Sequence, residues 1–203
     1  MKKYVLSAVI FAVALSLVAF RFSTTGLPIG SSLPMSNVKM KNIKGDMVSM
    51  KDAMKKNGLL VMFTCNTCPF VIKNQARTKE ICKYALENNV GVILLNSNEG
   101  QRANDDSFDE MKKYAAQQGY NWYYVVDKDN AAADAFGANR TPECFLFNKE
   151  SKLYYHGAID DNPTEAENVK RQHLKEAINE LIAGKDITVK ESRSVGCSIK
   201  RKA

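Results

Sequence analysis

One stretch of this sequence constrains the fold more than any other: a short apolar run that ends in two closely spaced cysteines. Residues 59–63, Leu-Leu-Val-Met-Phe, have the continuous apolar pattern of a buried strand. Cys65 and Cys68 follow almost at once, and from there to about residue 87 the apolar residues recur at helical spacing. A three-residue offset on a helix brings two side chains to the same face. The sequence therefore predicts two neighbouring sulfurs where a buried strand meets the start of a helix.

Such a junction favours thiol chemistry. A helix N-terminus presents unpaired N–H groups and positive potential, and both stabilise the nucleophilic thiolate. We expect Cys65 to lie at the exposed end and to attack a partner disulfide, after which Cys68 attacks the mixed disulfide and releases the reduced product. Pro69 suits the first helical turn, where a missing N–H costs little.

Two other interpretations of the cysteine pair are weaker. A structural zinc site needs four ligands, whereas the chain has no second Cys-x-x-Cys and only two histidines. An inert structural disulfide is the other alternative, and the strand that feeds the pair directly into a helix argues against it. We therefore interpret the pair as redox-active, with no metal and no cofactor.

The rest of the chain alternates between predicted strands and helices. A hairpin is expected over residues 38–50, strands over 90–95, 122–126, 144–147 and 153–156, and helices over 107–118, 131–136 and 169–183. Alternation of this kind favours a mostly parallel sheet, to which the hairpin at 144–156 adds antiparallel strands. The expected fold class is α/β, with a central mixed sheet flanked by helices on both faces.

The chain divides into four predicted regions. Residues 1–23 carry Lys2 and Lys3 before a long apolar run, which indicates a signal peptide or a retained N-terminal anchor. Residues 24–35 contain Gly, Pro and Ser and are expected to be a linker. The domain itself is expected over 36–185, followed by a tail over 186–203. On this basis we expect the protein to be exported, and to be either periplasmic or anchored in the membrane facing the periplasm.

The net charge of +7 does not indicate a nucleic-acid partner, because the basic residues of the domain are scattered among acidic ones. Contact with a membrane is expected only through the N-terminal segment, if that segment is not cleaved.

Several blocks resemble a known family. Residues 63–70, Phe-Thr-Cys-Asn-Thr-Cys-Pro-Phe, resemble the active-site stretch of thioredoxin-like proteins of the peroxiredoxin-like redoxin group. The later blocks that resemble the same group are 106–112, 135–142, 157–162 and the Gly-Cys-Ser-Ile-Lys sequence at 196–200. The resemblance implies a thioredoxin-like fold and a thiol–disulfide oxidoreductase in which Cys65 and Cys68 are catalytic. Its partners would be protein or small-molecule thiols and disulfides.

The resemblance also implies a second part of the site. By likeness to the family, Pro142 is a cis-proline that faces the cysteine pair, and Thr141 offers backbone groups to the bound substrate. Two departures from thioredoxins are visible: Thr64 replaces the usual Trp, and Asn66-Thr67 replaces Gly-Pro between the cysteines. That dipeptide tunes the redox potential, so the resemblance does not fix the direction of electron flow.

Two further functions stay open. One is a thiol-dependent peroxidase, with Cys65 as peroxidatic thiolate and Cys68 or Cys197 resolving it, although the chain lacks the Pro-x-x-x-Thr-x-x-Cys motif of true peroxiredoxins. The other is a non-enzymatic soft-metal binding module that uses Cys65 and Cys68.

The remaining cysteines differ in their expected roles. The chain has five cysteines, so at least one stays unpaired in a monomer. Cys82 and Cys144 fall on apolar faces and are expected in the core. Cys197 lies in the Gly-Cys-Ser-Ile-Lys block, and is either a third redox thiol or tail-docking residue, or an unpaired surface thiol.

Overall fold

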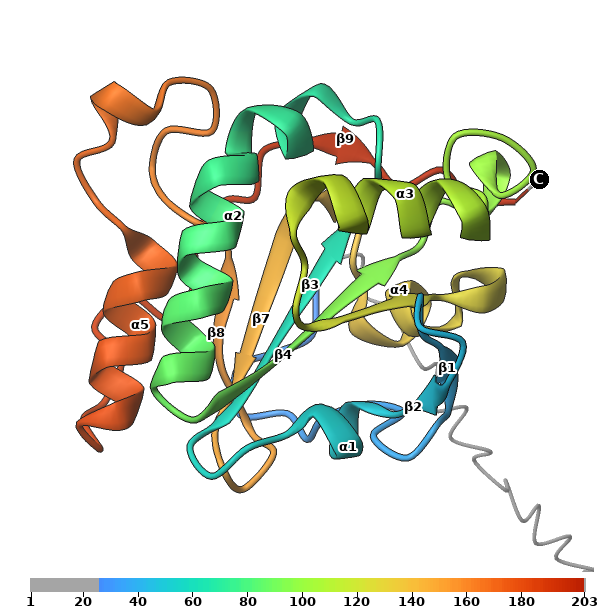
Figure 1. Cartoon of the computed structure of the whole chain (residues 1–203). Helices are drawn as coiled ribbons and strands as arrows, with labels where there is room; N and C mark the ends of the chain where they lie inside the picture. Colours follow the sequence, from blue (N-terminus) through green and yellow to red (C-terminus); the bar gives the residue numbers. More distant parts are fainter. Residues whose placement is uncertain (1–25, 203) are drawn as a thin grey trace, which may run out of the picture.

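A five-stranded mixed sheet forms the centre of the computed structural model, which describes residues 26–202 (Figure 1). In spatial order the strands are β5 (Tyr123–Val126), β4 (Val90–Asn96), β3 (Gly58–Thr64), β7 (Glu143–Phe147) and β8 (Leu153–Gly157). Strands β3, β4 and β5 are parallel, whereas β7 is antiparallel to both β3 and β8. The predicted mixed α/β sheet is therefore confirmed.

Strands β3 and β4 are buried along their whole length, as their continuous apolar sequences predict. Their alternate side chains enter two separate cores. Leu60 and Met62 belong to the core on one face of the sheet, whereas Leu59, Val61 and Phe63 belong to the core on the other.

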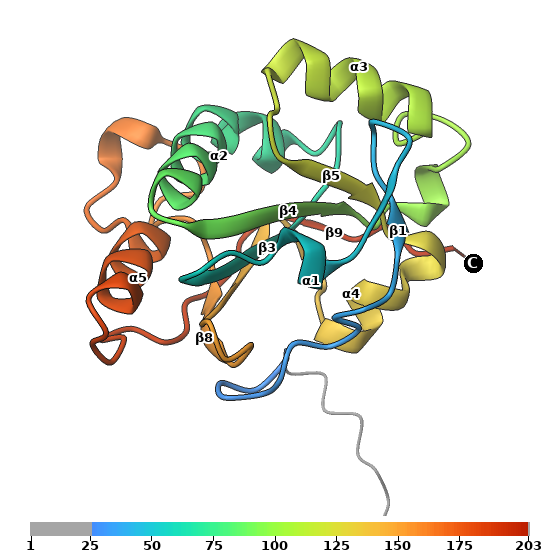
Figure 2. The same ribbon diagram turned by 60° about the horizontal axis from the view of Figure 1, so that its bottom comes forward.

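Helices cover both faces of the sheet (Figure 2). One face carries α2 (Pro69–Glu87), α3 (Phe108–Gln118) and α5 (His173–Ile182), and the other carries α1 (Met50–Ala53) and α4 (Ala131–Phe136). The short elements are β1 (Met40–Lys41), β2 (Met47–Val48), η1 (Glu99–Gln101), η2 (Lys128–Asn130), β6 (Arg140–Thr141), η3 (Ala166–Asn168) and β9 (Cys197–Ser198). Strands β1 and β2 form the predicted hairpin.

Helix ends follow local chemistry. The Ser107 hydroxyl accepts the Glu110 N–H at 3.3 Å and starts α3, and Gly119 ends that helix in the left-handed conformation. Helix α5 begins at His173, so the predicted start at residue 169 is wrong. The chain there forms the short turn η3, and Val169 is then extended, which prevents the helical pattern from starting earlier.

The segment before β1 packs against the edge of the sheet. The Gly30 N–H donates to the Leu153 carbonyl and the Leu33 N–H to the Ser151 carbonyl, each at 2.8 Å, and the Leu33 side chain is buried. Residues 26–35, which fall within the expected linker, thus lie on the domain. The expected signal peptide or anchor over 1–23 lies outside the described residues. Within residues 26–202 no helix is long and apolar enough to cross a membrane.

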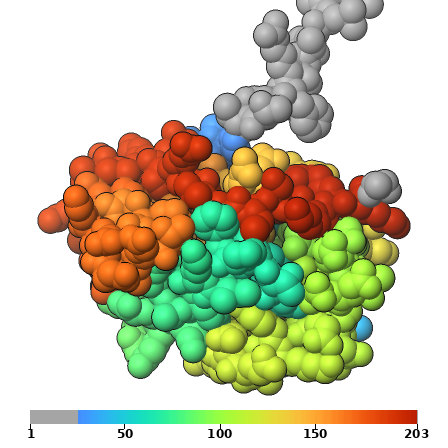
Figure 3. Space-filling model, turned by 90° about the horizontal axis from the view of Figure 1, so that it is seen from above, coloured from blue at the N-terminus to red at the C-terminus, as the bar shows by residue number. Residues whose placement is uncertain are grey.

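The tail after α5 also returns to the domain. The His156 N–H donates to the Lys190 carbonyl and the Ser192 N–H to the His156 carbonyl, each at 3.0 Å, so the tail runs along β8. It then forms β9, which pairs with β6. Figure 3 shows this C-terminal segment, in red, crossing the surface beside the start of α2, in teal.

Candidate functional site

The two cysteines of the predicted pair lie where β3 gives way to α2. Cys65 directly follows β3, Cys68 is the N-cap residue of α2 in extended conformation, and Pro69 is its first helical residue. The buried strand β3 fixes this junction at its own C-terminal end, in the middle of the sheet. The predicted position of the pair at a helix N-terminus is confirmed.

The loop at Thr141 lies against both sulfurs. The Thr141–Pro142 peptide bond is cis, as the family resemblance implied. The Thr141 hydroxyl is 3.5 Å from Cys65 Sγ, and Cys68 Sγ, in its thiol form, donates a hydrogen bond to the Thr141 carbonyl at 3.4 Å. The structure thus brings Cys65, Cys68 and the Thr141–Pro142 segment together.

The pair is more enclosed than expected. The side chain of Cys65 is 1% exposed and that of Cys68 is 5% exposed, so the expectation of an exposed Cys65 is wrong. Hydrogen bonds from Asn66 to Asp105 and Asp106 tie the loop after β3 inward, and Cys197 of the tail packs against the pair. Both sulfurs border a cavity of about 260 Å³, whose other lining residues include Asn98, Gln101, Cys197 and Lys200.

The two thiols share one negative charge unequally. A hydrogen bond from the Cys65 thiol lowers the pKa of Cys68 to about 4, and further hydrogen bonds from Cys197 and the Val71 N–H act in the same direction. The pKa of Cys65 is raised, because its proton is held by Cys68, because it is buried, and because the Asp106 carboxylate is near. The helix N-terminus thus favours a thiolate at Cys68, the second cysteine of the pair.

A buried polar network fixes the loop between the cysteines. The Asp106 carboxylate accepts hydrogen bonds from the Asn66 N–H at 2.8 Å, the Asn96 amide at 2.6 Å and the Asn98 amide at 2.9 Å. The Tyr124 hydroxyl donates to the Asn66 side chain at 2.8 Å and accepts from the Asn96 amide. Sequence reasoning missed this network, although Asp106 opens one of the blocks that resemble the family.

The Glu143 carboxylate fixes the segment of the site that precedes Thr141. One of its carboxylate oxygens accepts the N–H groups of Asn139 and Arg140, at 2.8 and 2.9 Å, and the other is 2.7 Å from His156 Nε2. These contacts hold the chain that leads into Thr141. His156 lies on β8, within the strand predicted over 153–156, but its carboxylate partner was not predicted.

The other cysteines fall into two groups. Cys82 and Cys144 lie in the core, as expected, and burial raises the pKa of each. Cys197, on β9, packs against Cys65 and Cys68 and hydrogen-bonds to Cys68. All five cysteines are free thiols in this structure. Three sulfurs therefore meet at one site.

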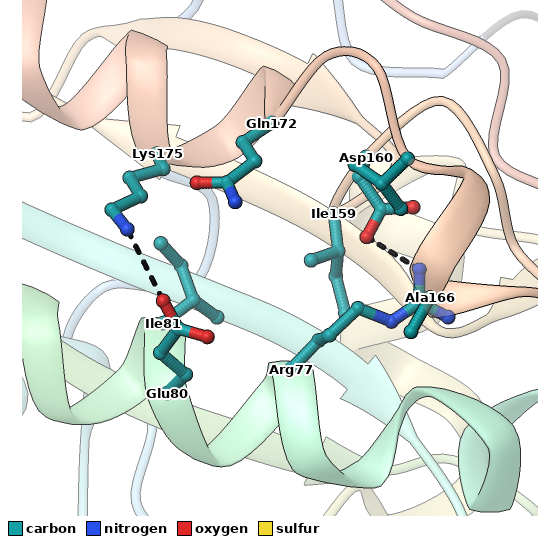
Figure 4. Close-up of a pocket in the computed structure, with 9 residues that line it drawn as sticks. Arg77, Glu80, Ile81, Ile159, Asp160, Ala166, Gln172 and Lys175 are labelled. Atoms are coloured by element: carbon teal, nitrogen blue, oxygen red, sulfur yellow. Dashed lines mark hydrogen bonds and ion pairs between the residues drawn. The ribbon is translucent and has the colours of Figure 1, made fainter.

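A second cavity, of about 210 Å³, lies between α2 and the chain around the start of α5 (Figure 4). Two ion pairs cross it, Arg77 with Asp160 at 2.6 Å and Lys175 with Glu80 at 3.1 Å. These pairs link α2 to the segments that pack beside it. No cysteine lines this second cavity, so the candidate redox site is the cavity beside Cys65 and Cys68. Within residues 26–202 no group of three or more His, Cys, Asp or Glu residues could hold a metal ion.

A cysteine pair between a strand and a helix N-terminus, facing a cis-proline loop on a mixed sheet, defines the thioredoxin-like class of proteins. The family model described as Redoxin matches residues 28–172. The chain therefore belongs to the redoxin family, and this membership supports a redox function.

Solved structures agree with this assignment. An uncharacterized conserved protein from Geobacillus kaustophilus is 30% identical, with a TM-score of 0.80, covering 86% of this chain and 93% of the other. A hypothetical protein from Sinorhizobium meliloti 1021 is 27% identical, also with a TM-score of 0.80, covering 88% and 97%.

A more distant structure shares the fold alone. The thioredoxin domain of a thiol-disulfide oxidoreductase from Bacteroides vulgatus is 19% identical, with a TM-score of 0.53, covering 64% of this chain and 88% of that one. The search of curated proteins found no significant match.

Proposed function

We propose that this redoxin is an exported thiol–disulfide oxidoreductase that uses Cys65 and Cys68 as its dithiol. The observation that carries the proposal is the placement of both sulfurs at the N-terminus of α2, in contact with Thr141 beside a cis-proline. A thiolate stabilised at that point is the form that attacks disulfides. Its substrates are protein or small-molecule disulfides, or thiols in the reverse direction.

The reduced enzyme begins the exchange at Cys68. The Cys68 thiolate attacks one sulfur of a substrate disulfide, the substrate S–S bond breaks, and the leaving sulfur departs as a thiolate that takes up a proton. Cys68 is then in a mixed disulfide and carries no charge, so the main barrier to ionising Cys65 is removed. Cys65 loses its proton and attacks Cys68 Sγ, which forms the Cys65–Cys68 disulfide and releases the second substrate thiol. Two electrons pass from the enzyme to the substrate.

In this proposal Cys68, and not Cys65 as expected from the sequence, makes the first attack. Cys68 has the lowered pKa, and Cys65 is the more deeply buried of the two. The Thr141 hydroxyl and carbonyl orient the two sulfurs. Pro142 has no backbone N–H, so position 142 offers no hydrogen-bond donor that could compete for these groups.

Insulin-disulfide reduction by the full-length protein, with dithiothreitol as electron donor, tests the proposal. We expect Cys65→Ser and Cys68→Ser to fall to the background rate, and Cys82→Ala, which changes a core cysteine outside the pair, to keep the wild-type rate. If either pair variant is as active as wild type, the proposal is wrong. Dithiol-dependent peroxide consumption is the matched assay for the peroxidase alternative; turnover there without insulin reduction would favour a peroxidase.

Export is a separate part of the proposal, supported by Lys2 and Lys3 before the apolar run. It is tested by expressing the full chain in bacteria and treating intact cells with a membrane-impermeant thiol reagent that carries a mass tag. We expect Cys197 or Cys68 to be labelled in intact cells. Labelling only after lysis would contradict export.

A further inference from the structure

The tail occupies the backbone position at which a substrate is expected. The family resemblance assigns the backbone of Thr141 to substrate binding, yet in this structure Thr141 is paired with Cys197 in the antiparallel β6–β9 ladder. The approach is close: a Cβ placed on Gly196 would lie 2.1 Å from the Thr141 carbonyl oxygen, so only glycine fits there. An extended segment of the protein itself therefore lies alongside the cis-proline loop.

On the C-terminal side of Cys197, hydrogen bonds and a buried side chain hold this segment in place. The Ile199 N–H donates to the Asn139 carbonyl at 3.0 Å, and the Ile199 side chain is buried. The Lys200 N–H donates to the Asn98 side chain at 2.9 Å, and the Lys200 carbonyl accepts the Gly100 N–H at 2.8 Å. Asn98 in turn belongs to the Asp106 network that fixes the loop between the cysteines. The position of Cys197 is thus set by the same polar network as the redox pair.

Cys197 lies where a substrate sulfur would react. Its thiol hydrogen-bonds to Cys68 and packs against the small apolar cluster of the pair. Cys197 is also less buried than Cys65 and Cys68, and it lines the same cavity as they do. A thiol that is close to the pair and also open to the cavity can exchange in both directions.

We propose that Cys197 is an internal exchange partner of the Cys65–Cys68 pair, and that the tail carries it in the position of a substrate strand. The inference rests on the proposed function and deepens it, because it names a thiol through which outside thiols exchange with the pair.

The exchange needs no additional oxidant or reductant. In the oxidised enzyme Cys197 gives up its proton and attacks Cys68 Sγ, the Cys65–Cys68 bond breaks, and Cys65 leaves as a thiolate that takes up a proton. The disulfide is now between Cys68 and Cys197. An outside thiolate attacks Cys197 Sγ, and Cys68 leaves as a thiolate. A second outside thiol then attacks the outer sulfur of this mixed disulfide and releases Cys197 as a thiol. The sum is two outside thiols converted to one disulfide and the enzyme returned to its dithiol form.

The first experiment traps the predicted disulfide. Full-length Cys65→Ser protein is oxidised with glutathione disulfide, quenched in acid and alkylated, and its peptides are mapped by mass spectrometry. We expect a Cys68–Cys197 disulfide in most molecules. If Cys68 is instead found joined to glutathione while Cys197 is alkylated as a free thiol, the inference is overturned.

The second experiment measures the rate at which glutathione reduces the oxidised wild-type protein. We expect Cys197→Ser and Cys197→Ala each to slow this step by roughly tenfold or more, because a positioned internal thiol is lost. Ser194→Ala is the matched tail control, since the Ser194 hydroxyl has no hydrogen-bond partner, and we expect the wild-type rate. A wild-type rate in both Cys197 variants would overturn the inference.

These results separate the inference from the proposed function. If the Cys197 variants reduce insulin and are themselves reduced by glutathione at wild-type rates, only the internal exchange fails. If Cys65→Ser protein is as active on insulin as wild type, the proposed function fails with it. A urea unfolding midpoint equal to that of wild type establishes that a slowed Cys197 variant is folded.

Discussion

The Asp106 carboxylate accepts the backbone N–H of Asn66 at 2.8 Å, which fastens the loop between the two cysteines to a residue forty positions further along the chain. The same carboxylate also accepts the side-chain amides of Asn96 and Asn98, and it is fully buried. A buried carboxylate with three donors on it is a rigid support, because each donor would lose a partner if it moved.

Removal of this carboxylate should weaken the fold and the site together. We expect Asp106→Ala to lower the free energy of unfolding by about 3 kcal/mol or more, because several buried donors lose a charged acceptor. Urea unfolding measures this change, and the insulin assay should show a loss of activity in the folded protein. Asp109→Asn, at an exposed position on α3, is the control and should change stability by less than about 0.5 kcal/mol. Equal stability of the two variants would contradict the supporting role of Asp106.

The reactivity of Cys68 should persist in acid. Thiols alkylate as thiolates, so the rate falls as pH drops through the pKa. For Cys68 we expect half of the plateau rate at about pH 4, measured by iodoacetamide labelling and peptide mass spectrometry. In Cys65→Ala the principal hydrogen-bond donor to Cys68 is lost, and the midpoint should move to higher pH. A wild-type midpoint near the ordinary thiol value of 9 would contradict the proposed charge distribution.

The close contact at Gly196 gives a test of how the tail docks. In Gly196→Ala the new Cβ would collide with the backbone of Thr141, so β9 must move away from β6. We expect faster hydrogen exchange at the Ile199 amide, which donates to the Asn139 carbonyl in the docked tail, and faster alkylation of Cys197. Ser194→Ala serves as control. Unchanged exchange at Ile199 in the Gly196 variant would show that the tail docks differently.

The core on the α4 face should depend on Phe136. Its ring makes edge contacts with the rings of Phe63, Phe145 and Phe147, at centroid distances of 5.1 to 5.9 Å. We expect Phe136→Ala to lower the free energy of unfolding by about 3–5 kcal/mol. Ile72→Ala, at a side chain that is 55% exposed, should cost far less. Urea unfolding compares the two, and similar losses would place Phe136 outside the core.

The regular elements could be predicted because their sequence patterns are local. Strand β3 is a continuous apolar run, and α4 has the predicted bounds of 131–136, ended by Gly137 in the left-handed conformation. The start of α5 was harder, because Gln172 caps it without a side-chain hydrogen bond and so leaves no sequence signal.

The site was predictable only in part. The position of the cysteine pair follows from a strand and a helix that are adjacent in sequence, and the cis peptide at Pro142 follows from the family resemblance. The enclosure of Cys65 could not be predicted in this way, because it depends on Asp106 and on β9, which are distant along the chain. The two residues of β9 are too few to show periodicity, and its docking depends on the close approach of Gly196 to Thr141 and on hydrogen bonds to segments that are distant along the chain.

The position of β9 in chain order has a consequence for synthesis. Domains form as the chain emerges, with earlier segments available first. The strand, the cysteine pair and α2 leave the ribosome long before Cys197 does. A nascent chain can therefore present Cys65 and Cys68 without the segment that later lies over them, and it is open to oxidation by outside disulfides in that interval. During this interval of synthesis the third thiol is absent from the site.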